Sequence, residues 1–273
     1  MGLDQQFPVR VDKVRASLAF LISAPIGILG GLIGLGGAEF RLPVLVGPLG
    51  YSAKQSVPLN LAISLVTVSA SLLIRSRSLS LEPVGPYLPV ILALIGGAVS
   101  SAFWGPGLVG RLSNQRLERI IFFLLTIIGI ALIVEAFLPQ DLSGLLPMQA
   151  TLRIGAGLIF GIMIGLVSSL LGVAGGELII PTLIFAFGVD IKTAGTASLI
   201  ISLPTILTGL IRYSRQGAFV DRLPIKETVA PMSFGSVIGA VVGGVLVGIV
   251  PVFALKFGLG LILIYSAYRI FRH

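Results

Sequence analysis

Long apolar segments alternate with short polar connections along the whole chain. The segments lie near residues 16–36, 57–74, 84–104, 120–138, 150–172, 194–211, 228–250 and 252–268. Each approaches the ~20 residues that a helix needs to cross a bilayer. They stay apolar over lengths at which the strands of a membrane barrel would alternate in polarity. The pattern therefore predicts an all-α polytopic membrane protein.

The second half of the chain repeats the pattern of the first. A shift of 138 positions aligns residues 34–77 with residues 172–215 without a gap, and 15 of these 44 positions are identical. The identities include a glutamate, a proline and a lysine, which shared hydrophobicity alone would not keep in register. We predict a cytoplasmic N-terminal segment (1–15), a first transmembrane repeat (16–138), a connector (139–149) and a second transmembrane repeat (150–273).

Each repeat also contains one apolar segment that is too short to cross. Residues 38–49 and 176–187 would form about 18 Å of helix, against a hydrocarbon core of ~30 Å. Short segments interrupted by glycine and proline at matching positions of two repeats are typical of a transporter's binding site. We predict about four transmembrane helices plus one half-length helix, re-entrant or broken, in each repeat. Re-entrant segments would give eight crossings and parallel repeats, whereas crossing segments would give ten crossings and inverted repeats.

Glycines precede both short segments and define the candidate binding site. Gly36 and Gly37 in the first repeat, and Gly175 and Gly176 in the second, allow the backbone to leave helical geometry and approach a solute. A helix that begins there, as at Ala38, has unpaired amide groups and the positive end of its dipole at the break. Both favour an anion. We expect the two helix starts to face one central cavity.

Glu39 and Glu177 occupy equivalent positions just inside the short segments. In one interpretation, each carboxylate caps the N-terminus of its own helix. In the other, the cost of an ionisable group at membrane depth indicates a role in a proton or ion pathway. The two interpretations are compatible, because a cap that gains a proton loses its hold on the helix. Both glutamates are therefore candidates for proton coupling.

Arg41 and a polar face on the next span complete the predicted site. Arg41 has no basic counterpart in the second repeat, and it either binds an anion through paired N–H groups or extends to the lipid interface. Asn60 and Ser64 share one helical face, and Ser198 and Ser202 are their equivalents in the second repeat. These side chains either line a solute path or form hydrogen bonds between helices.

Composition narrows the class of function. Hydrophobic residues make up 55% of the 273 residues and charged residues only 11%, with a mean hydropathy of +1.06. The net charge of +8 is spread over short connections, which fits membrane topology and not nucleic-acid binding. The chain has no cysteine and its one histidine is the last residue, so we predict no enzyme activity, metal or cofactor, although a Ser/Lys pair stays open.

The two glycine-rich motifs resemble those of the TauE/SafE-like sulfite exporter family. They read G-x-G-G-A-E-x3-P at 34–43 and G-x-x-G-G-E-x3-P at 172–181, each after a first span. Through the duplicated layout, the resemblance covers nearly the whole chain. It implies a bacterial or archaeal cytoplasmic-membrane transporter of sulfite, sulfonates or related sulfur or carboxylate anions. Ala38 departs from the second motif, which has Gly176 in its place.

Together, these features predict a secondary transporter in the inner membrane of a prokaryote, with both termini in the cytoplasm. It would move a small sulfur-containing oxyanion or organosulfonate, such as sulfite, by alternating access around the two Gly/Glu motifs, with proton coupling. The alternatives are a Na⁺-coupled carrier for another small carboxylate or solute, a membrane-embedded enzyme and a non-transporting membrane subunit. The expected partners are a small anion and the lipid bilayer, and a homo-oligomer is compatible with the sequence.

Overall fold

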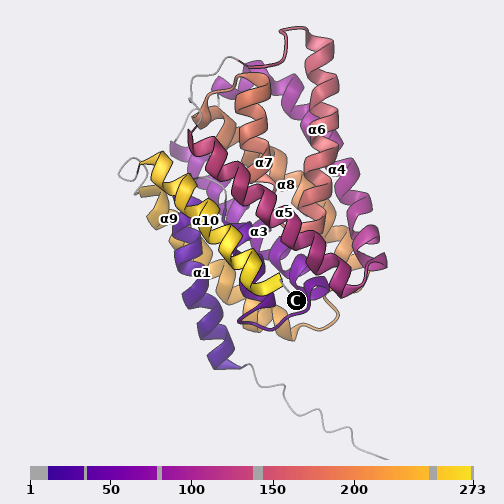
Figure 1. The fold of residues 1–273 in the computed structure, drawn as a ribbon, viewed down its shortest axis with the longest axis vertical. Coiled ribbons are helices and arrows are strands. Elements are labelled where there is room, and N and C mark those ends of the chain that lie inside the picture. The colour runs from indigo at the N-terminus through magenta and orange to yellow at the C-terminus, as the bar shows by residue number, and fades with distance from the viewer. Residues whose placement is uncertain (1–11, 34–35, 79–81, 138–143, 246–250, 272–273) are drawn as a thin grey trace, which may run out of the picture.

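The computed structural model describes residues 12–33, 36–78, 82–137, 144–245 and 251–271. Over these residues the chain forms helices and no strands (Figure 1). The first half comprises α1 (Lys13–Ile33), α2 (Ala38–Val46), α3 (Ala53–Ser78), the 3-10 turn η1 (Glu82–Tyr87), α4 (Leu88–Arg111) and α5 (Asn114–Phe137). The second half comprises α6 (Ala150–Leu171), α7 (Gly176–Pro181), the π-helical turn η2 (Thr182–Ala186), α8 (Ile191–Arg215), the π-helical turn η3 (Ile225–Val229), α9 (Ala230–Val245) and α10 (Val252–Phe271).

Seven helical stretches of the described chain are long and apolar enough to cross a membrane. They are α1, α3, η1 with α4, α5, α6, α8, and η3 with α9. The last predicted span corresponds to α10, whose described apolar part, Lys256–Tyr268, is shorter. An all-α polytopic membrane protein is thus confirmed. The two segments predicted to be half-length contain α2, and α7 with η2.

Each short helix returns to the end of the molecule where the preceding long helix begins. Near the start of α1, the Arg15 guanidinium donates to the carbonyl of Leu49, in the loop after α2. The same guanidinium lies 4.4 Å from the ring centroid of Tyr51. In the second half, Arg153 near the start of α6 donates to the carbonyl of Phe187 at 2.5 Å, just after η2. The long and short helices of each half therefore form a hairpin.

The last helices of the two halves pack against each other in opposite directions. Phe137 at the end of α5 contacts Phe253 at the start of α10, with ring centroids 5.1 Å apart. Gly129 and Gly260, farther along each helix, also meet. Accordingly, α1 and α6 begin at opposite ends of the molecule (Figure 1). The halves run in inverted directions, and α1 begins and α10 ends beside the same loop, near Gly50.

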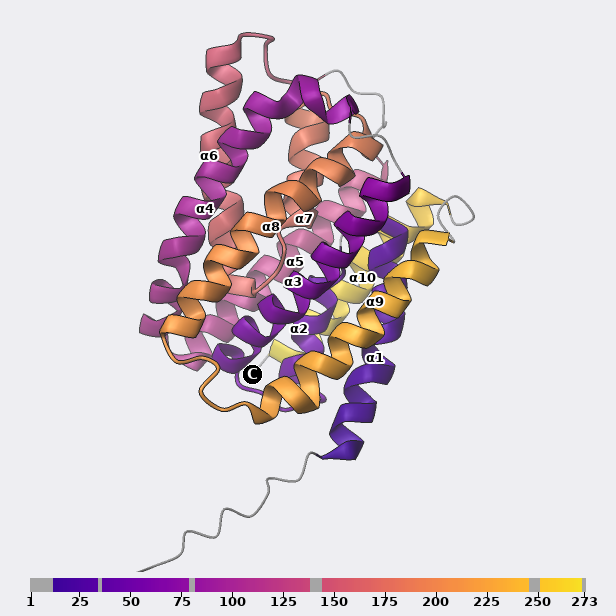
Figure 2. The same ribbon diagram turned by 180° about the vertical axis from the view of Figure 1, so that it is seen from behind.

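Small residues allow the two halves to interlock. α1 packs in parallel on α9, where a side chain at Gly27 or Gly31 would collide with the backbone of Ser236 or Ala240. In the same way, α6 packs in parallel on α4. Close approach of small residues is the usual means of helix association in membranes, because lipid offers no hydrophobic driving force between helices. α3 and α8 lie side by side at the centre of the molecule (Figure 2).

An aspartate fixes the start of α8. The Asp190 carboxylate accepts hydrogen bonds from the backbone amides of Lys192 and Thr193, at 3.1 and 3.0 Å. Partial burial acts to raise the pKa of Asp190, but these hydrogen bonds outweigh it and lower the pKa below its usual value. This N-cap defines where the chain leaves the hairpin of α6 and α7 and enters the central helix α8.

Candidate functional site

Glycines with left-handed backbone angles turn the chain into each short helix. Gly36 and Gly37, with φ of 86° and 67°, precede α2, and Gly175, with φ of 81°, precedes α7. A Cβ at Gly37 would lie 2.9 Å from Ile26 of α1, and one at Gly175 would lie 3.0 Å from Ile164 of α6. Both short helices therefore begin against the side of the preceding long helix, part-way along it. Only glycine fits there without strain.

Arg41 lies in the interior, with an exposed fraction of 0%. Its Nε donates to Asn60 Oδ1 at 3.2 Å, Nη1 to the Gly36 carbonyl at 2.8 Å and Nη2 to Ser64 Oγ at 2.9 Å. A longer contact of 3.5 Å joins Nη1 to Ser236 Oγ on α9. The alternative that Arg41 extends to the lipid interface is wrong. Its guanidinium instead joins α2 and α3 of the first half to α9 of the second.

The polar face of α3 holds this arrangement in place. Asn60 Nδ2 donates to the Ala38 carbonyl at 2.8 Å and to the Leu171 carbonyl, at the end of α6, at 3.5 Å. Ser64 Oγ donates to the Asn60 carbonyl at 2.8 Å. Asn60 thus links helices of both halves, and both Asn60 and Ser64 present oxygen atoms to Arg41.

Glu39 and Glu177 are buried next to this network without hydrogen-bond partners. Their exposed fractions are 0% and 4%, and none of their four carboxylate oxygens has a partner among the described residues. The two carboxyl groups are close enough to act on each other, and both act on Arg41. Both glutamates lie in the first turn of their helices, where the dipole favours a negative charge, but their oxygens have no amide partner in hydrogen-bond geometry. Unpaired buried carboxyl groups are costly, which makes them candidates for binding a proton or an ion.

The second half contributes less polar chemistry around α7. Ile179 occupies the position equivalent to Arg41 and packs in an apolar cluster. On α8, Ser198 donates to the Gly195 carbonyl of its own helix at 3.3 Å, and Ser202 is buried. Gly176 is buried at the first position of α7. The candidate site is therefore asymmetric, although its two carboxylates come from equivalent positions.

A cavity of about 830 Å³ runs along α2 from Phe40, beside Glu39, to the loop that follows α2. Glu118 of α5 and Tyr265 of α10 line its other side. The cavity lies at the end of the molecule where α1 begins and α10 ends. Phe40 is its lining residue nearest in sequence to Glu39, which is fully buried and does not itself line the cavity.

At the opposite end, the equivalent positions carry a buried ion pair. The position that corresponds to Glu118 is Lys256, which is buried and places Nζ 2.6 Å from Glu135 Oε1. Residues 144–146 cover η2, with the backbone amides of Leu145 and Leu146 donating to η2 carbonyls. This ion pair was not among the residues predicted from the sequence. The sequence feature that could have predicted it is a glutamate in the last apolar segment of the first repeat and a lysine in the last apolar segment of the second.

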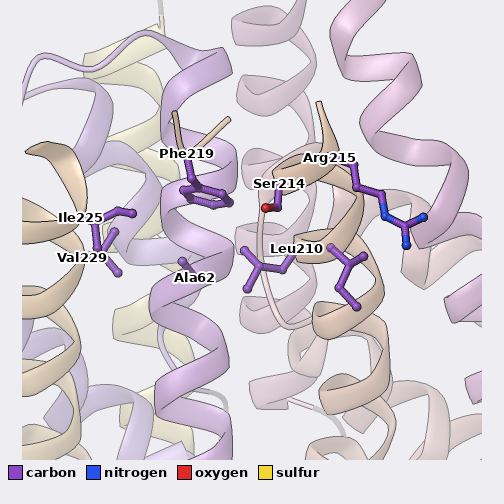
Figure 3. Close-up of a pocket in the computed structure, with 8 residues that line it drawn as sticks. Ala62, Leu210, Ser214, Arg215, Phe219, Ile225 and Val229 are labelled. Atoms are coloured by element: carbon purple, nitrogen blue, oxygen red, sulfur yellow. The ribbon is translucent and has the colours of Figure 1, made fainter. Parts of the chain in front are cut away.

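A second cavity, of about 510 Å³, lies between α3, the end of α8 and η3. Figure 3 shows the Phe219 ring pointing into it, whereas the Arg215 side chain extends away from the other lining residues. Its lining is mostly apolar, with Ala62, Leu210 and Val229 among its residues. Ser214 and Arg215 are its polar lining residues, and neither comes from the two glycine-rich motifs, so this cavity is not the candidate site.

Inverted halves of apolar helices, with two short helices that meet at buried ionisable groups, define the protein as a polytopic membrane protein of the transporter class. The chain belongs to the family described as sulfite exporter TauE/SafE, whose sequence profile matches residues 4–132 and 157–273. It is also similar to the probable membrane transporter protein YdhB of Bacillus subtilis (strain 168), with 23% identity over 241 residues, 88% of this chain and 93% of that protein. No solved structure gives a significant match. The family and this relative identify the chain as a membrane transporter.

Proposed function

We propose that the protein is a secondary transporter of a small sulfur-containing oxyanion or organosulfonate, such as sulfite. The observation that carries this proposal is the fully buried Arg41 beside two carboxyl groups without partners, at the point where both short helices begin. A guanidinium is the side chain best suited to an oxyanion, because its N–H groups match two oxygens at once. The matching family is named after sulfite export, which makes sulfite the first anion to test.

Alternating access of the two halves is the proposed mechanism. It is supported by the opposite directions of the halves and by the unequal ends of the molecule. A cavity reaches Phe40 from one end, whereas the buried Lys256–Glu135 ion pair joins the two halves at the other. Movement of one half against the other would close the cavity at the first end and open one at the second, while the site between them stays in place. In this mechanism, the structure represents the state that is open at the end where α1 begins and α10 ends. We expect this end to face the cytoplasm.

Proton coupling through Glu39 and Glu177 is part of the proposal. Two carboxyl groups buried side by side cannot easily both be charged, so the pair is suited to gain and lose protons. The same unpaired oxygens also suit Na⁺, which prefers oxygen ligands, and this keeps a Na⁺-coupled carrier as the second candidate. The two candidates differ in which gradient drives transport.

Uptake into proteoliposomes tests the proposal. Sulfite, thiosulfate, sulfate, small sulfonates and small carboxylates are offered as labelled solutes under an imposed pH gradient, an imposed Na⁺ gradient, or neither. We expect saturable uptake of at least one sulfur oxyanion or sulfonate that increases with the pH gradient, and none in protein-free liposomes. Uptake that follows the Na⁺ gradient would establish the second candidate. No uptake of any anion by correctly inserted protein would favour a non-transporting subunit.

A further inference from the structure

Building on the proposed transport function, we infer that the site carries a singly charged anion together with one proton, so that transport is electroneutral and doubly charged anions are excluded. The inference follows from the charges of the cluster formed by Arg41, Glu39 and Glu177, which is called the central triad below. It fixes the charge class of the substrate, which the family name leaves open.

The central triad is isolated from other charges. The charged groups that act on Glu39 are Glu177 and Arg41, and those that act on Arg41 are the two glutamates. The other side chains that reach Arg41 are neutral, namely Asn60 and Ser64 of α3 and Ser236 of α9. Because Arg41 stays protonated in a protein, the net charge of the triad depends only on how many protons the two carboxyl groups hold.

The empty site is neutral when the carboxyl pair holds one proton. With none, the triad carries one negative charge, and with two it carries one positive charge. A net charge in a buried site is costly because it has lost its hydration. Both carboxyl groups are buried without a partner among the described residues, so the state with one proton, in which the triad has no net charge, is the least costly for the empty site.

A bound monoanion gives the neutral site a net negative charge, and a second proton neutralises it. The anion adds one negative charge beside Arg41, where the long contact of 3.5 Å to Ser236 leaves an N–H group available for a stronger acceptor. The site becomes neutral again if the carboxyl pair then holds two protons. One proton therefore enters with each monoanion and leaves with it, and no net charge crosses the membrane.

A dianion cannot be neutralised in the same way. Even with both carboxyl groups protonated, Arg41 balances only one of its charges. One negative charge would then stay unpaired in a site whose side chains are almost fully buried. The central triad thus discriminates by charge between anions of similar shape.

The test compares methanesulfonate with sulfate, two tetrahedral anions of similar size that differ by one charge, with sulfite alongside. Uptake into proteoliposomes is measured while the pH gradient and the membrane potential, set by potassium and valinomycin, are varied independently. We expect methanesulfonate uptake to increase with an inward proton gradient, to be unchanged by a potential of either sign, and to exceed sulfate uptake by on the order of tenfold or more. The potential is tested with whichever anion enters.

Glutamine variants distinguish this charge balance from a simple requirement for carboxylates. In Glu177→Gln, Arg41 and a charged Glu39 are neutral together without a proton. Glu39 can still take up one proton when a monoanion binds, so uptake should stay coupled to protons and electroneutral. In Glu39→Gln/Glu177→Gln the triad carries a fixed positive charge. That double variant should bind a monoanion without a proton, lose its response to the pH gradient, and respond to the potential if it still transports. Binding to the solubilised variants, followed as a shift in thermal unfolding, keeps the test valid if transport stops.

The outcomes separate this inference from the proposed function. If no anion enters by way of the wild-type protein, the transport function itself fails. If an anion enters but its uptake follows the potential, if sulfate enters as fast as methanesulfonate, or if the double variant still responds to the pH gradient, transport stands and the charge balance is overturned.

Discussion

At the scale of single residues, the partners of Arg41 determine what it can do. The sequence pattern is compatible with this side chain inside the protein and with one at the lipid surface, because a short segment near the start of a repeat allows both. Its partners Asn60 and Ser236 lie 19 and 195 positions away in the sequence. No local pattern specifies such contacts, so only the folded arrangement shows the guanidinium in the interior.

Replacing Arg41 tests whether its charge or only its hydrogen bonds matter. Arg41→Gln should abolish anion uptake, because it removes the positive charge of the site, and it should also lower stability by ~1–3 kcal/mol through the unpaired groups left behind. Arg41→Lys keeps the charge but loses the planar fork, and should retain weak uptake. Uptake and thermal unfolding are measured on the same preparations.

The matched control for Arg41 is Lys54→Gln, which removes a positive charge from a half-buried residue whose hydrogen bond to the Gly110 carbonyl is at the surface. It should leave uptake within about twofold of the wild type, since exposed charges in water contribute little. Normal uptake by a folded Arg41→Gln protein would show that the anion binds elsewhere.

At the scale of elements, the sequence located the short helices but not their direction. Glycine pairs, proline and segment length are local features, and they placed the breaks near the starts of α2 and α7. Length favoured a re-entrant segment, whereas the structure combines a returning short helix with inverted halves. The direction of a short helix depends on which earlier residue the loop after it contacts, as Arg15 contacts Leu49. Hydropathy does not predict such a contact.

Two glycines with the same backbone angle separate strain from close packing. Gly37 and Gly50 both have φ of 67°, but a Cβ at Gly37 would lie 2.9 Å from Ile26, whereas nothing lies within 4 Å of one at Gly50. Alanine at either position costs ~1–2 kcal/mol of backbone strain. Gly37→Ala should lose a further ~1–3 kcal/mol through overpacking and lose most of its uptake.

Thermal unfolding and uptake of Gly37→Ala and Gly50→Ala check this prediction. Gly175 and Gly217 form a second pair for the other half, with φ of 81° and 82° and nearest contacts of 3.0 and 3.6 Å. Equal losses within both pairs would mean that the close approach of the short helices to α1 and α6 has no special role in the site.

At the scale of the whole molecule, the Lys256–Glu135 ion pair joins the two halves at the end opposite the large cavity. Removing one partner of a buried pair costs ~3–5 kcal/mol, because it leaves a charge without compensation, whereas apolar replacement of both is often neutral. The double variant Glu135→Leu/Lys256→Met therefore removes the connection without a buried charge. If the pair holds this end closed, that variant should shift the protein toward the oppositely open state.

Cysteine labelling measures this shift, because the chain contains no cysteine of its own. Val44 lines the cavity, and Thr182 is its equivalent in the other half. In the double variant, labelling of Thr182→Cys should increase and that of Val44→Cys decrease. A coupling of ~1–3 kcal/mol would change the open population by roughly 5–150-fold. The exchanged pair Glu135→Lys/Lys256→Glu should label like the wild type. Unchanged labelling in a folded double variant would exclude the pair as a closure.

Sequence alone determined the class of fold, the positions of the spans and the two sites where short helices begin. These depend on the hydrophobicity and backbone freedom of neighbouring residues, which the bilayer selects segment by segment. Tertiary structure alone decided that the halves are inverted, that Glu39 and Glu177 act on each other, and that Lys256 pairs with Glu135. Each of these facts joins residues more than a hundred positions apart. Such contacts arise from how helices pack, because that packing brings distant charges together at a depth where they must neutralise one another.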